Sequence, residues 1–284
     1  MELQAALHSL HLYSPDPLAA AHFYGTTYAM AVEAAEGGYI CRGPGRQLQI
    51  SSGPANRLKY AQFELHTGEA WKAFAKRVKV LEHQPSPAGV NCINGDNGDQ
   101  TPVCLKDPDG NLLVFIAPLA TGAGVMSVSG AVPSATLQHF GMRTTDLPAM
   151  LDFYTGKLGF ILSDAVRDSD GILRACFLRT DFLHHALALF FSPEARFDHQ
   201  SFEAPDWASM REWGDRMASI RVPIVWGIGR HGPGNDVFFM VSDPDGNLAE
   251  ISAEIEHCQP DRPAGEWPHE ERTLNVWGRA IMRS

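Results

Sequence analysis

Three residues in the second half of the sequence carry side chains that can bind one metal ion together: His139, His199 and Glu250. Two imidazoles and one carboxylate form the facial triad of non-haem Fe(II) sites. Such a site keeps coordination positions open, which suits an iron that binds both a substrate and O₂. Zinc with the same ligands is an alternative, as in sites that activate water. The residue types therefore predict a metal centre with open positions.

These residues stand out because the chain repeats itself. The Phe-Tyr pairs at 23–24 and 153–154 lie 130 residues apart, and the turn sequence "DPDGN" at 107–111 recurs 136 residues later. On this alignment, the three candidate ligands replace other residues of the first copy: Ser9, Tyr60 and Val114. A metal centre is therefore expected in the second copy alone.

Strands are expected to hold the three ligands, because alternate residues of a strand point to one face. The strands expected for them are residues 136–144, 198–204 and 248–253. Each copy also predicts two helices and a final hairpin whose turn is "DPDGN", since Pro and Gly favour a tight turn. The fold class expected is α+β, with tandem domains at 1–121 and 134–256.

The segments outside the two copies are a linker and a tail. Residues 119–134 are rich in Gly, Ser and Ala and read as the linker. Residues 257–284 belong to neither copy and form a C-terminal tail.

Composition restricts the class of protein. The formal net charge of −10 argues against nucleic acid and anionic membranes as partners. The N-terminal stretch lacks the basic start and long apolar run of a signal peptide. Five scattered cysteines without a CxxC motif favour reduced thiols over a disulfide framework; they are Cys41, Cys92, Cys104, Cys176 and Cys258. A cytoplasmic location is therefore expected.

At this point the sequence resembles a known family, the two-domain type I extradiol ring-cleavage dioxygenases of the vicinal oxygen chelate superfamily. The resemblance covers nearly the whole chain, and five stretches carry it: "LQHFGMRTTD", "HHALALF", "FDHQSFE", "GIGRHGPGND" and "SDPDGNLAEI". It implies that each domain is a pair of βαβββ modules forming a partly open barrel, and that the N-terminal domain lacks the metal site. It also implies that His139, His199 and Glu250 bind Fe(II), for which Mn(II) could substitute.

The resemblance implies roles for two further histidines. His185 matches the active-site acid–base, and a side chain that titrates near neutrality suits that role. Its neighbour His184 is expected to point away, because only one of two adjacent strand residues can face the metal. His231 matches the histidine that hydrogen-bonds a substrate hydroxyl, and its flanking glycines suggest a loop or bulge beside the pocket.

The sequence departs from the family pattern at Met240, where the family usually has a tyrosine that helps deprotonate the bound diol. A thioether cannot transfer that proton. Met240, Phe238 and Trp226 are expected either to line an apolar substrate pocket or to belong to the core. The tail resembles a segment that covers the active-site mouth in some relatives, and a subunit-contact arm is the alternative.

The function expected is an extradiol dioxygenase that cleaves a small aromatic diol with O₂, in a homo-oligomer. One alternative is a non-oxidative enzyme of glyoxalase type, an isomerase or hydrolase. Such sites draw ligands from both repeat halves, and the first-copy residues Ser9, Tyr60 and Val114 argue against that. A non-catalytic small-molecule binding protein is the other alternative, which the histidines of the second copy disfavour.

Overall fold

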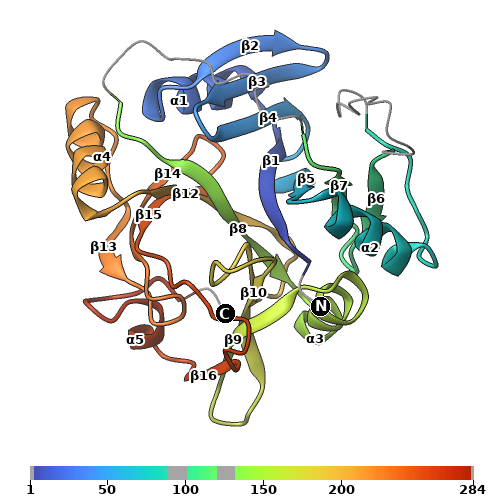
Figure 1. Ribbon diagram of the computed structural model, residues 1–284. Coiled ribbons are helices and arrows are strands. Elements are labelled where there is room, and N and C mark those ends of the chain that lie inside the picture. The colour runs from blue at the N-terminus through green and yellow to red at the C-terminus, as the bar shows by residue number, and fades with distance from the viewer. Residues whose placement is uncertain (1–2, 88–100, 120–131, 283–284) are drawn as a thin grey trace.

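The computed structural model describes residues 3–87, 101–119 and 132–282, and it contains two mixed β-sheets with few helices (Figure 1). The first sheet has seven strands in the order β2-β3-β4-β1-β5-β7-β6, and the second has nine in the order β13-β14-β15-β12-β8-β11-β10-β9-β16. Neither sheet closes on itself among the described residues, since each has two edge strands. The α+β class and the open arrangement predicted from the sequence are confirmed.

The first sheet and its helices occupy residues 5–116. The elements are β1 (Ala5–Ser14), α1 (Pro17–Thr27), β2 (Ala31–Ala35), β3 (Gly38–Gly43), β4 (Arg46–Ser52), β5 (Arg57–Leu65), α2 (Gly68–Val78), β6 (Val103–Lys106) and β7 (Leu112–Ile116). Strands β1 and β5 are antiparallel neighbours at the centre. Cys92 and residues 120–131 of the expected linker lie outside the described residues.

The second sheet repeats this plan. Its elements are β8 (Thr136–Thr144), α3 (Leu147–Asp152), a π-helical turn (Phe153–Leu158), β9 (Ile161–Arg167), β10 (Leu173–Arg179), β11 (Leu187–Phe191), β12 (Arg196–Ala204), α4 (Trp207–Ser219), β13 (Trp226–Arg230), β14 (Val237–Ser242) and β15 (Leu248–Ala253). Asp146 caps α3, because its Oδ1 accepts a hydrogen bond from the Ala149 backbone N–H at 3.0 Å. Asp16 caps α1 in the same way, with 3.0 Å to the Ala19 N–H.

The tail is part of the second sheet. Strand β16 (Gly265–Pro268) pairs in parallel with β9, and the short helix α5 (Glu271–Leu274) follows it (Figure 1). The sequence assigned the tail to neither repeat copy, and in the structure its strand extends the sheet edge of the second copy. Hydrogen bonding between β16 and β9 thus attaches the tail to the edge of the second sheet.

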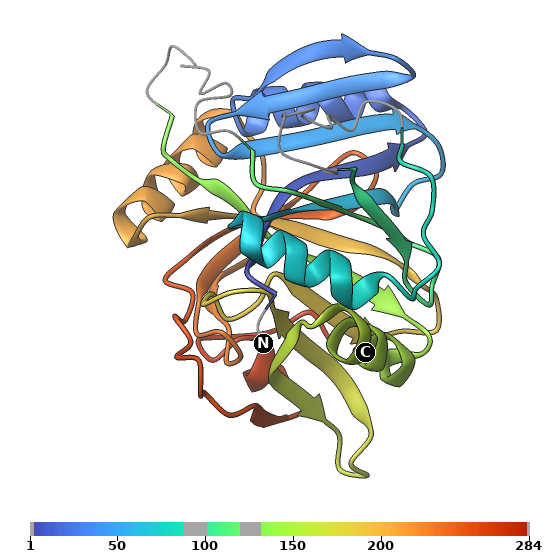
Figure 2. The same ribbon diagram turned by 45° about the vertical axis from the view of Figure 1, so that its right-hand side comes forward.

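The two sheets lie against each other, with β1 beside β8 at the centre of the molecule (Figures 1 and 2). Apolar residues on the helix-facing sides of both sheets join in one continuous core. The opposite side of the second sheet carries different side chains. On β14, for example, Val237, Phe239 and Val241 face the core, whereas Phe238 and Met240 face the other side. No helix in the described part of the chain is long and apolar enough to span a membrane.

Candidate metal centre and active site

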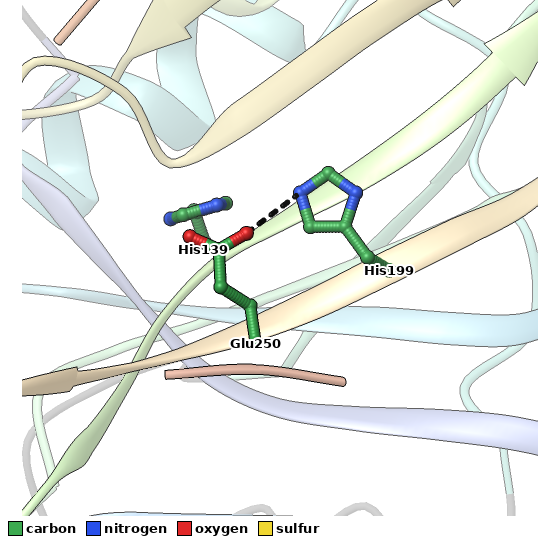
Figure 3. Close-up of side chains that lie close together, drawn as sticks. All are labelled: His139, His199 and Glu250. Carbon is green, nitrogen blue, oxygen red and sulfur yellow. Dashed lines mark ion pairs between the residues drawn. The ribbon is translucent and has the colours of Figure 1, made fainter. Parts of the chain in front are cut away.

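The three predicted ligands come together on three adjacent strands of the second sheet (Figure 3). His139 lies on β8, His199 on β12 and Glu250 on β15, and all three are buried. Each offers one ligand atom, and these atoms lie within 4.8 Å of one another. His199 Nε2 lies 4.0 Å from Glu250 Oε2. The spacing is that of side chains able to surround one ion.

Two β-bulges place hydrogen-bond partners beside the two histidines. The register between β12 and β8 shifts at Asp198 and again at Gln138, so each is an extra residue in its strand. Each directly precedes a predicted ligand, and a bulge redirects a side chain that would otherwise point to the opposite face. His199 Nδ1 donates to Asp198 Oδ1 at 2.7 Å, and His139 Nδ1 donates to Gln138 Oε1. These bonds leave Nε2 of both rings to face the centre.

Asp198 and Gln138, the hydrogen-bond partners of the two histidines, are themselves fixed by further hydrogen bonds. Arg143 Nε donates to Asp198 Oδ2 at 2.6 Å, and the Gln138 amide nitrogen donates to the His185 carbonyl at 2.5 Å. Both rings are therefore fixed in orientation by two successive hydrogen bonds, as is common for metal-binding histidines.

Gly141 makes space for the His199 ring. It is the residue opposite His199 on β8. A Cβ atom at this position would lie 2.2 Å from His199 Cε1 and 2.3 Å from Nδ1. Any side chain here would displace the ring, so the close approach of strand and imidazole requires glycine.

The first sheet has the same framework without the ligands. Its central strands carry bulges at His8 and Lys59, directly before Ser9 and Tyr60. Val114 pairs with Gln62, as Glu250 pairs with Ser201 in the second sheet. Both groups of potential metal ligands found among the described residues belong to the second half of the chain. The sequence contrast between the copies thus corresponds to equivalent positions in three dimensions.

A narrow cavity adjoins the three predicted ligands. Its lining residues are His139, Phe177, His185, Ala188, Phe190, His199, His231, Pro233, Glu250 and Leu274. The sequence did not point to Phe177, Ala188, Phe190, Pro233 or Leu274. Phe177 pairs with Ala188 across β10 and β11, and Phe190 follows two residues later on the same face. The alternation of side chains in "ALALFF", with a period of two, is the sequence signal that could have predicted this side of the cavity.

His185, the predicted acid–base, lines the cavity beside His139, but it is not on a strand. Strand β11 begins at Leu187, so His184 and His185 occupy the preceding loop. The argument that adjacent strand residues face opposite sides therefore does not apply, although His184 is not among the residues that line the cavity. The two rings contact each other, with Nδ1 of one 3.1 Å from Nδ1 of the other. Burial, followed by the neighbouring His139, lowers the pKa of His185 well below its ordinary value.

His231 also lines the cavity and directly follows β13. A bulge between Gly227 and Gly229 precedes it, which agrees with the irregular segment expected there. Its Nδ1 donates to the Leu274 carbonyl at 2.6 Å, and its ring stacks on Phe238 with centroids 3.7 Å apart. The hydrogen bond leaves Nε2 as the nitrogen able to meet a ligand.

Trp226, Phe238 and Met240 lie behind this wall. They form a buried cluster with Leu274 on the side of the sheet that also carries Glu250. Of the four, only Leu274 is among the residues that line the cavity. Trp226, Phe238 and Met240 therefore pack behind His231 and do not line the cavity. This agrees better with the expectation that they belong to the core than with the expectation that they line the substrate pocket.

Asp236 is a buried carboxyl group next to the site that the sequence did not single out. It belongs with His231 and Glu250 to the second group of potential ligand atoms lying within 4.8 Å. Burial, followed by the nearby Glu203, raises the pKa of Asp236 well above its ordinary value. Its position directly before β14 gives no sequence pattern that marks it in advance.

A family model matches part of the chain. Residues 136–251 match the model described as the Glyoxalase/Bleomycin resistance protein/Dioxygenase superfamily. The matched segment contains the three predicted ligands.

The similar sequences extend over nearly the whole chain. The chain is 29% identical to metapyrocatechase 2 of Cupriavidus necator over 300 aligned residues, which cover 96% of the chain and 89% of the relative. It is 25% identical to 3-methylcatechol 2,3-dioxygenase of Pseudomonas putida, over 72% of the chain and 73% of that relative. The resemblance to extradiol dioxygenases predicted from the sequence is confirmed.

Solved structures share the fold. Homoprotocatechuate 2,3-dioxygenase from Arthrobacter globiformis has a TM-score of 0.76 at 22% identity, covering 98% of the chain and 88% of that structure. The Mn(II)-bound glyoxalase from Novosphingobium aromaticivorans has a TM-score of 0.78 at 21% identity, covering 96% and 90%. At these identities the likeness establishes the vicinal oxygen chelate fold.

Proposed function

We propose that this protein is an extradiol dioxygenase that cleaves the ring of a small aromatic diol with O₂ at an Fe(II) site. The observation that carries the proposal is the arrangement of His139, His199 and Glu250 around one point. Both imidazoles are bonded at Nδ1, which leaves two Nε2 atoms and one carboxylate for the ion. The names of the relatives that match over most of the chain support the same reaction class.

The residues fit a divalent cation of the first transition row. Two imidazoles and one carboxylate suit Fe(II), and Mn(II) is an alternative that this ligand set does not exclude. When bound, Fe(II) supplies adjacent coordination positions for the diol and for O₂, together with a path for electrons between them. The proposal therefore includes a resident metal and specifies Fe(II) as the one that supports turnover.

Two histidines are placed to handle protons and substrate. His185 is the proposed catalytic acid–base, since it lines the cavity and its ring centroid lies 4.3 Å from that of His139. His231 is the proposed partner of a substrate hydroxyl, because its Nε2 is the ring nitrogen not bonded to Leu274. The aromatic rings of Phe177 and Phe190 provide an apolar wall that would exclude water from the reacting ring.

Met240 is proposed to act on the substrate indirectly. It is the residue opposite Glu250 on β14, and it packs beside Trp226 and Phe238. A thioether there cannot accept the diol proton. The proton must therefore pass to another group, and His231 and His185 are the candidates that line the cavity.

Entry of a substrate requires the cavity to widen. The space inside it for a water-sized sphere is about 10 Å³, which admits about one water molecule. Leu274 of the tail forms part of the lining. We therefore propose that the tail around α5 acts as a lid, in agreement with the role that the sequence suggested.

The domain division, oligomeric state and location also remain part of this proposal. The two sheets support domains at 1–121 and 134–256 with a tail at 257–284. Large apolar side chains are exposed around α4, β13 and the tail, among them Trp207, Ile228 and Trp277, and they support a homo-oligomer. Cys41, Cys104, Cys176 and Cys258 form no disulfide among the described residues, which supports a reducing cytoplasm.

The experiment that tests the proposal measures O₂ uptake. Purified protein is loaded anaerobically with Fe(II) and mixed with 3-substituted, 4-substituted and bicyclic catechols before air is admitted. O₂ consumption with the yellow absorbance of a ring-opened product is expected for at least one catechol. One iron bound per chain without O₂ uptake from any of them would overturn the dioxygenase assignment and favour a binding protein.

A variant of His185 tests its role separately. His185→Phe should retain one iron per chain and lose turnover by about 10²–10⁴-fold, the usual contribution of general acid–base catalysis. Full activity in this variant would remove His185 from the mechanism.

A further inference from the structure

A second group of potential ligand atoms lies beside the predicted metal centre and shares one residue with it. His231, Asp236 and Glu250 each offer one ligand atom, and these three atoms lie within 4.8 Å of one another. His139, His199 and Glu250 meet the same criterion. Glu250 is the side chain common to both groups, and a carboxylate has two oxygens with which it can serve two ions.

The carboxyl group of Asp236 is buried and lacks a hydrogen-bond donor. It has no exposed surface, and neither of its oxygens accepts a hydrogen bond from another residue in the described part of the chain. Arg230 does not supply the donor, because its guanidinium binds Glu254 Oε2 and the Asn235 carbonyl. Leaving a buried carboxyl group unpaired costs free energy, so such groups are normally paired or bound to a metal. A cation is therefore the partner that this side chain fits.

The loop between β13 and β14 brings the group together. The His231 backbone N–H donates to the Asp236 carbonyl at 2.9 Å, so these two residues close a tight turn. Asp236 directly precedes β14 and continues the alternation that puts Met240 on the face of Glu250. A Cβ atom at Gly234 would lie 3.0 Å from Asp236 Oδ1, and the φ of this glycine is +79°. The turn thus requires glycine where the backbone passes the carboxyl group.

His231 can join such a site as a neutral ligand. Its Nδ1 donates to the Leu274 carbonyl at 2.6 Å, and a carbonyl only accepts, so Nε2 is the nitrogen left for an ion. Asp198 and Gln138 accept from the predicted ligand histidines in the same way. One imidazole and two carboxylates suit a divalent ion of the first transition row, and Mn(II) is the one most at home among carboxylates.

We propose that a second divalent cation binds between His231, Asp236 and Glu250, so that Glu250 bridges two ions; this inference rests on the metal centre proposed above, in which His139 and His199 hold the first ion. Metal ions in two-metal sites lie about 3.5–4 Å apart. The second ion binds more weakly, because the charge of the first ion repels it. Protein loaded with one equivalent of metal therefore holds one ion, and excess metal fills the second site.

A filled second site changes what His231 can do. Its Nε2 is the atom proposed to meet a substrate hydroxyl, and a bound ion occupies the same lone pair. The second ion and the diol therefore compete, so that excess metal raises the KM for a catechol.

The direct test is an anaerobic titration of the metal-free, full-length protein with Mn(II). Calorimetry counts the ions, and electron paramagnetic resonance reports whether they are coupled. The wild type should bind two ions per chain. The six-line signal of the first equivalent should give way, during the second, to the signal of an exchange-coupled pair.

Two variants make the assignment specific. Asp236→Asn keeps the side-chain volume and removes one anionic ligand. It should weaken the second ion by more than about 100-fold, since loss of an outer hydrogen-bond partner alone costs about 10–100-fold. Its six-line signal should persist. Asp107→Asn is the matched control, because Asp107 is a buried carboxyl group of the first half, and this variant should bind two coupled ions.

The outcomes that overturn the inference are distinct. One ion per chain in the wild type overturns it. A second ion that is not coupled to the first, or that Asp236→Asn binds with wild-type affinity, also overturns it, because surface carboxylates of a chain with a net charge of −10 can hold such an ion. If Asp236→Asn does not fold, His231→Gln takes its place and should lose the second ion in the same way.

The Mn(II) titration needs no turnover, so it separates this inference from the proposed function. Two coupled ions without cleavage of any catechol leave the second site standing and remove the dioxygenase assignment. Catechol cleavage by a protein that binds one ion and no more leaves the assignment standing and overturns the second site.

Kinetics test the competition if a catechol is cleaved. Fe(II), kept reduced with ascorbate and supplied at ten times its second dissociation constant, should raise the wild-type KM about tenfold and that of Asp236→Asn less than about twofold. An unchanged wild-type KM overturns the assignment of His231 as a ligand of the second ion.

Discussion

The Tyr154 hydroxyl of the second half donates a hydrogen bond to Asp107 Oδ2 of the first half at 3.0 Å. The repeat-related pair makes the reciprocal contact, since the Tyr24 hydroxyl donates to Asp243 Oδ2 at 3.0 Å. Asp107 and Asp243 begin the two "DPDGN" turns, and Tyr24 and Tyr154 end the two Phe-Tyr pairs. The tyrosine of each half therefore donates a hydrogen bond to the "DPDGN" turn of the other half. The Phe-Tyr pair and the "DPDGN" turn, the two repeat markers in the sequence, are therefore the two partners of one type of hydrogen bond, which occurs twice in the molecule.

Removal of either hydroxyl should loosen the association of the halves. Tyr154→Phe and Tyr24→Phe each leave a buried carboxylate with one donor fewer, which should cost about 1–3 kcal/mol of unfolding free energy. Urea unfolding followed by fluorescence measures the change. Tyr39→Phe is the control, because Tyr39 is half-buried and its hydroxyl has no hydrogen bond among the described residues. Equal stability of all three variants would mean that the reciprocal contacts contribute nothing.

The same contact predicts how stability depends on pH. Burial raises the pKa of Asp107 to about 6, despite the hydrogen bonds from Asn111 and Tyr154. Between the unfolded pKa and about 6 the native state holds a proton that the unfolded state has lost, so stability falls as the pH rises through this window. The stability present below pH 4 should decrease by roughly 2–3 kcal/mol by pH 7 from this group alone.

The variant that isolates this effect is Asp107→Asn, which cannot titrate. Unfolding free energies between pH 4 and pH 7 should decline less steeply in Asp107→Asn than in the wild type. The exposed Asp152→Asn provides the comparison, and its profile should follow the wild type. An identical slope in Asp107→Asn and wild type would show that Asp107 titrates normally.

The repeat supplied an internal comparison from which the sequence predicted three side chains that the structure brings together. His139, His199 and Glu250 were visible as differences between two copies of one framework, and each lies on a strand where the sequence predicted one. The fold class followed from the same repeat. The turn residues and the caps Asp16 and Asp146 depend on local backbone chemistry, which a short stretch of sequence contains.

The site features that the sequence did not predict depend on irregular backbone. Gln138 and Asp198 neighbour the ligands in sequence, and simple strand alternation would place them on the opposite face. Two bulges bring them back. The contact between His184 and His185 was not predicted, because a loop stands where a strand was expected. Leu274 and Trp267 come from a tail whose docking depends on long-range pairing with β9 and on contacts that no local pattern encodes.

The bulge residues should control metal affinity without contacting the metal. Asp198→Ala and Gln138→Ala each remove the acceptor for a ligand Nδ1–H, so the ring loses its orientation and basicity, and metal affinity should fall about 10–100-fold. Anaerobic competition with a chromophoric chelator measures Fe(II) and Mn(II) binding. His8→Ala is the matched control, because His8 is the bulge residue at the equivalent position of the first sheet. Unchanged affinity in both variants would show that these hydrogen bonds do not support the metal site.

The last prediction concerns Met240, whose position opposite Glu250 brings the two side chains onto the same face of the sheet. Paired residues on adjacent strands have Cβ atoms about 4.5–5.5 Å apart, so a tyrosine hydroxyl at this position would reach the site. Met240→Tyr should keep one metal ion per chain, because none of the predicted ligands is altered. It should lower the unfolding free energy by about 1–3 kcal/mol, because the larger ring must fit into the buried cluster of Trp226, Phe238 and Leu274.

The informative measurement on this variant is the pH dependence of kcat/KM over a panel of catechols. A phenol at this position adds a group that can share the diol proton, so the acidic limb of the profile or the ranking of substrates should change. Met240→Leu is the control, since it conserves volume without adding a titratable group. If Met240→Tyr and Met240→Leu give the same pH profile and the same ranking, the side chain at 240 only packs, and the diol proton is handled entirely by the cavity histidines.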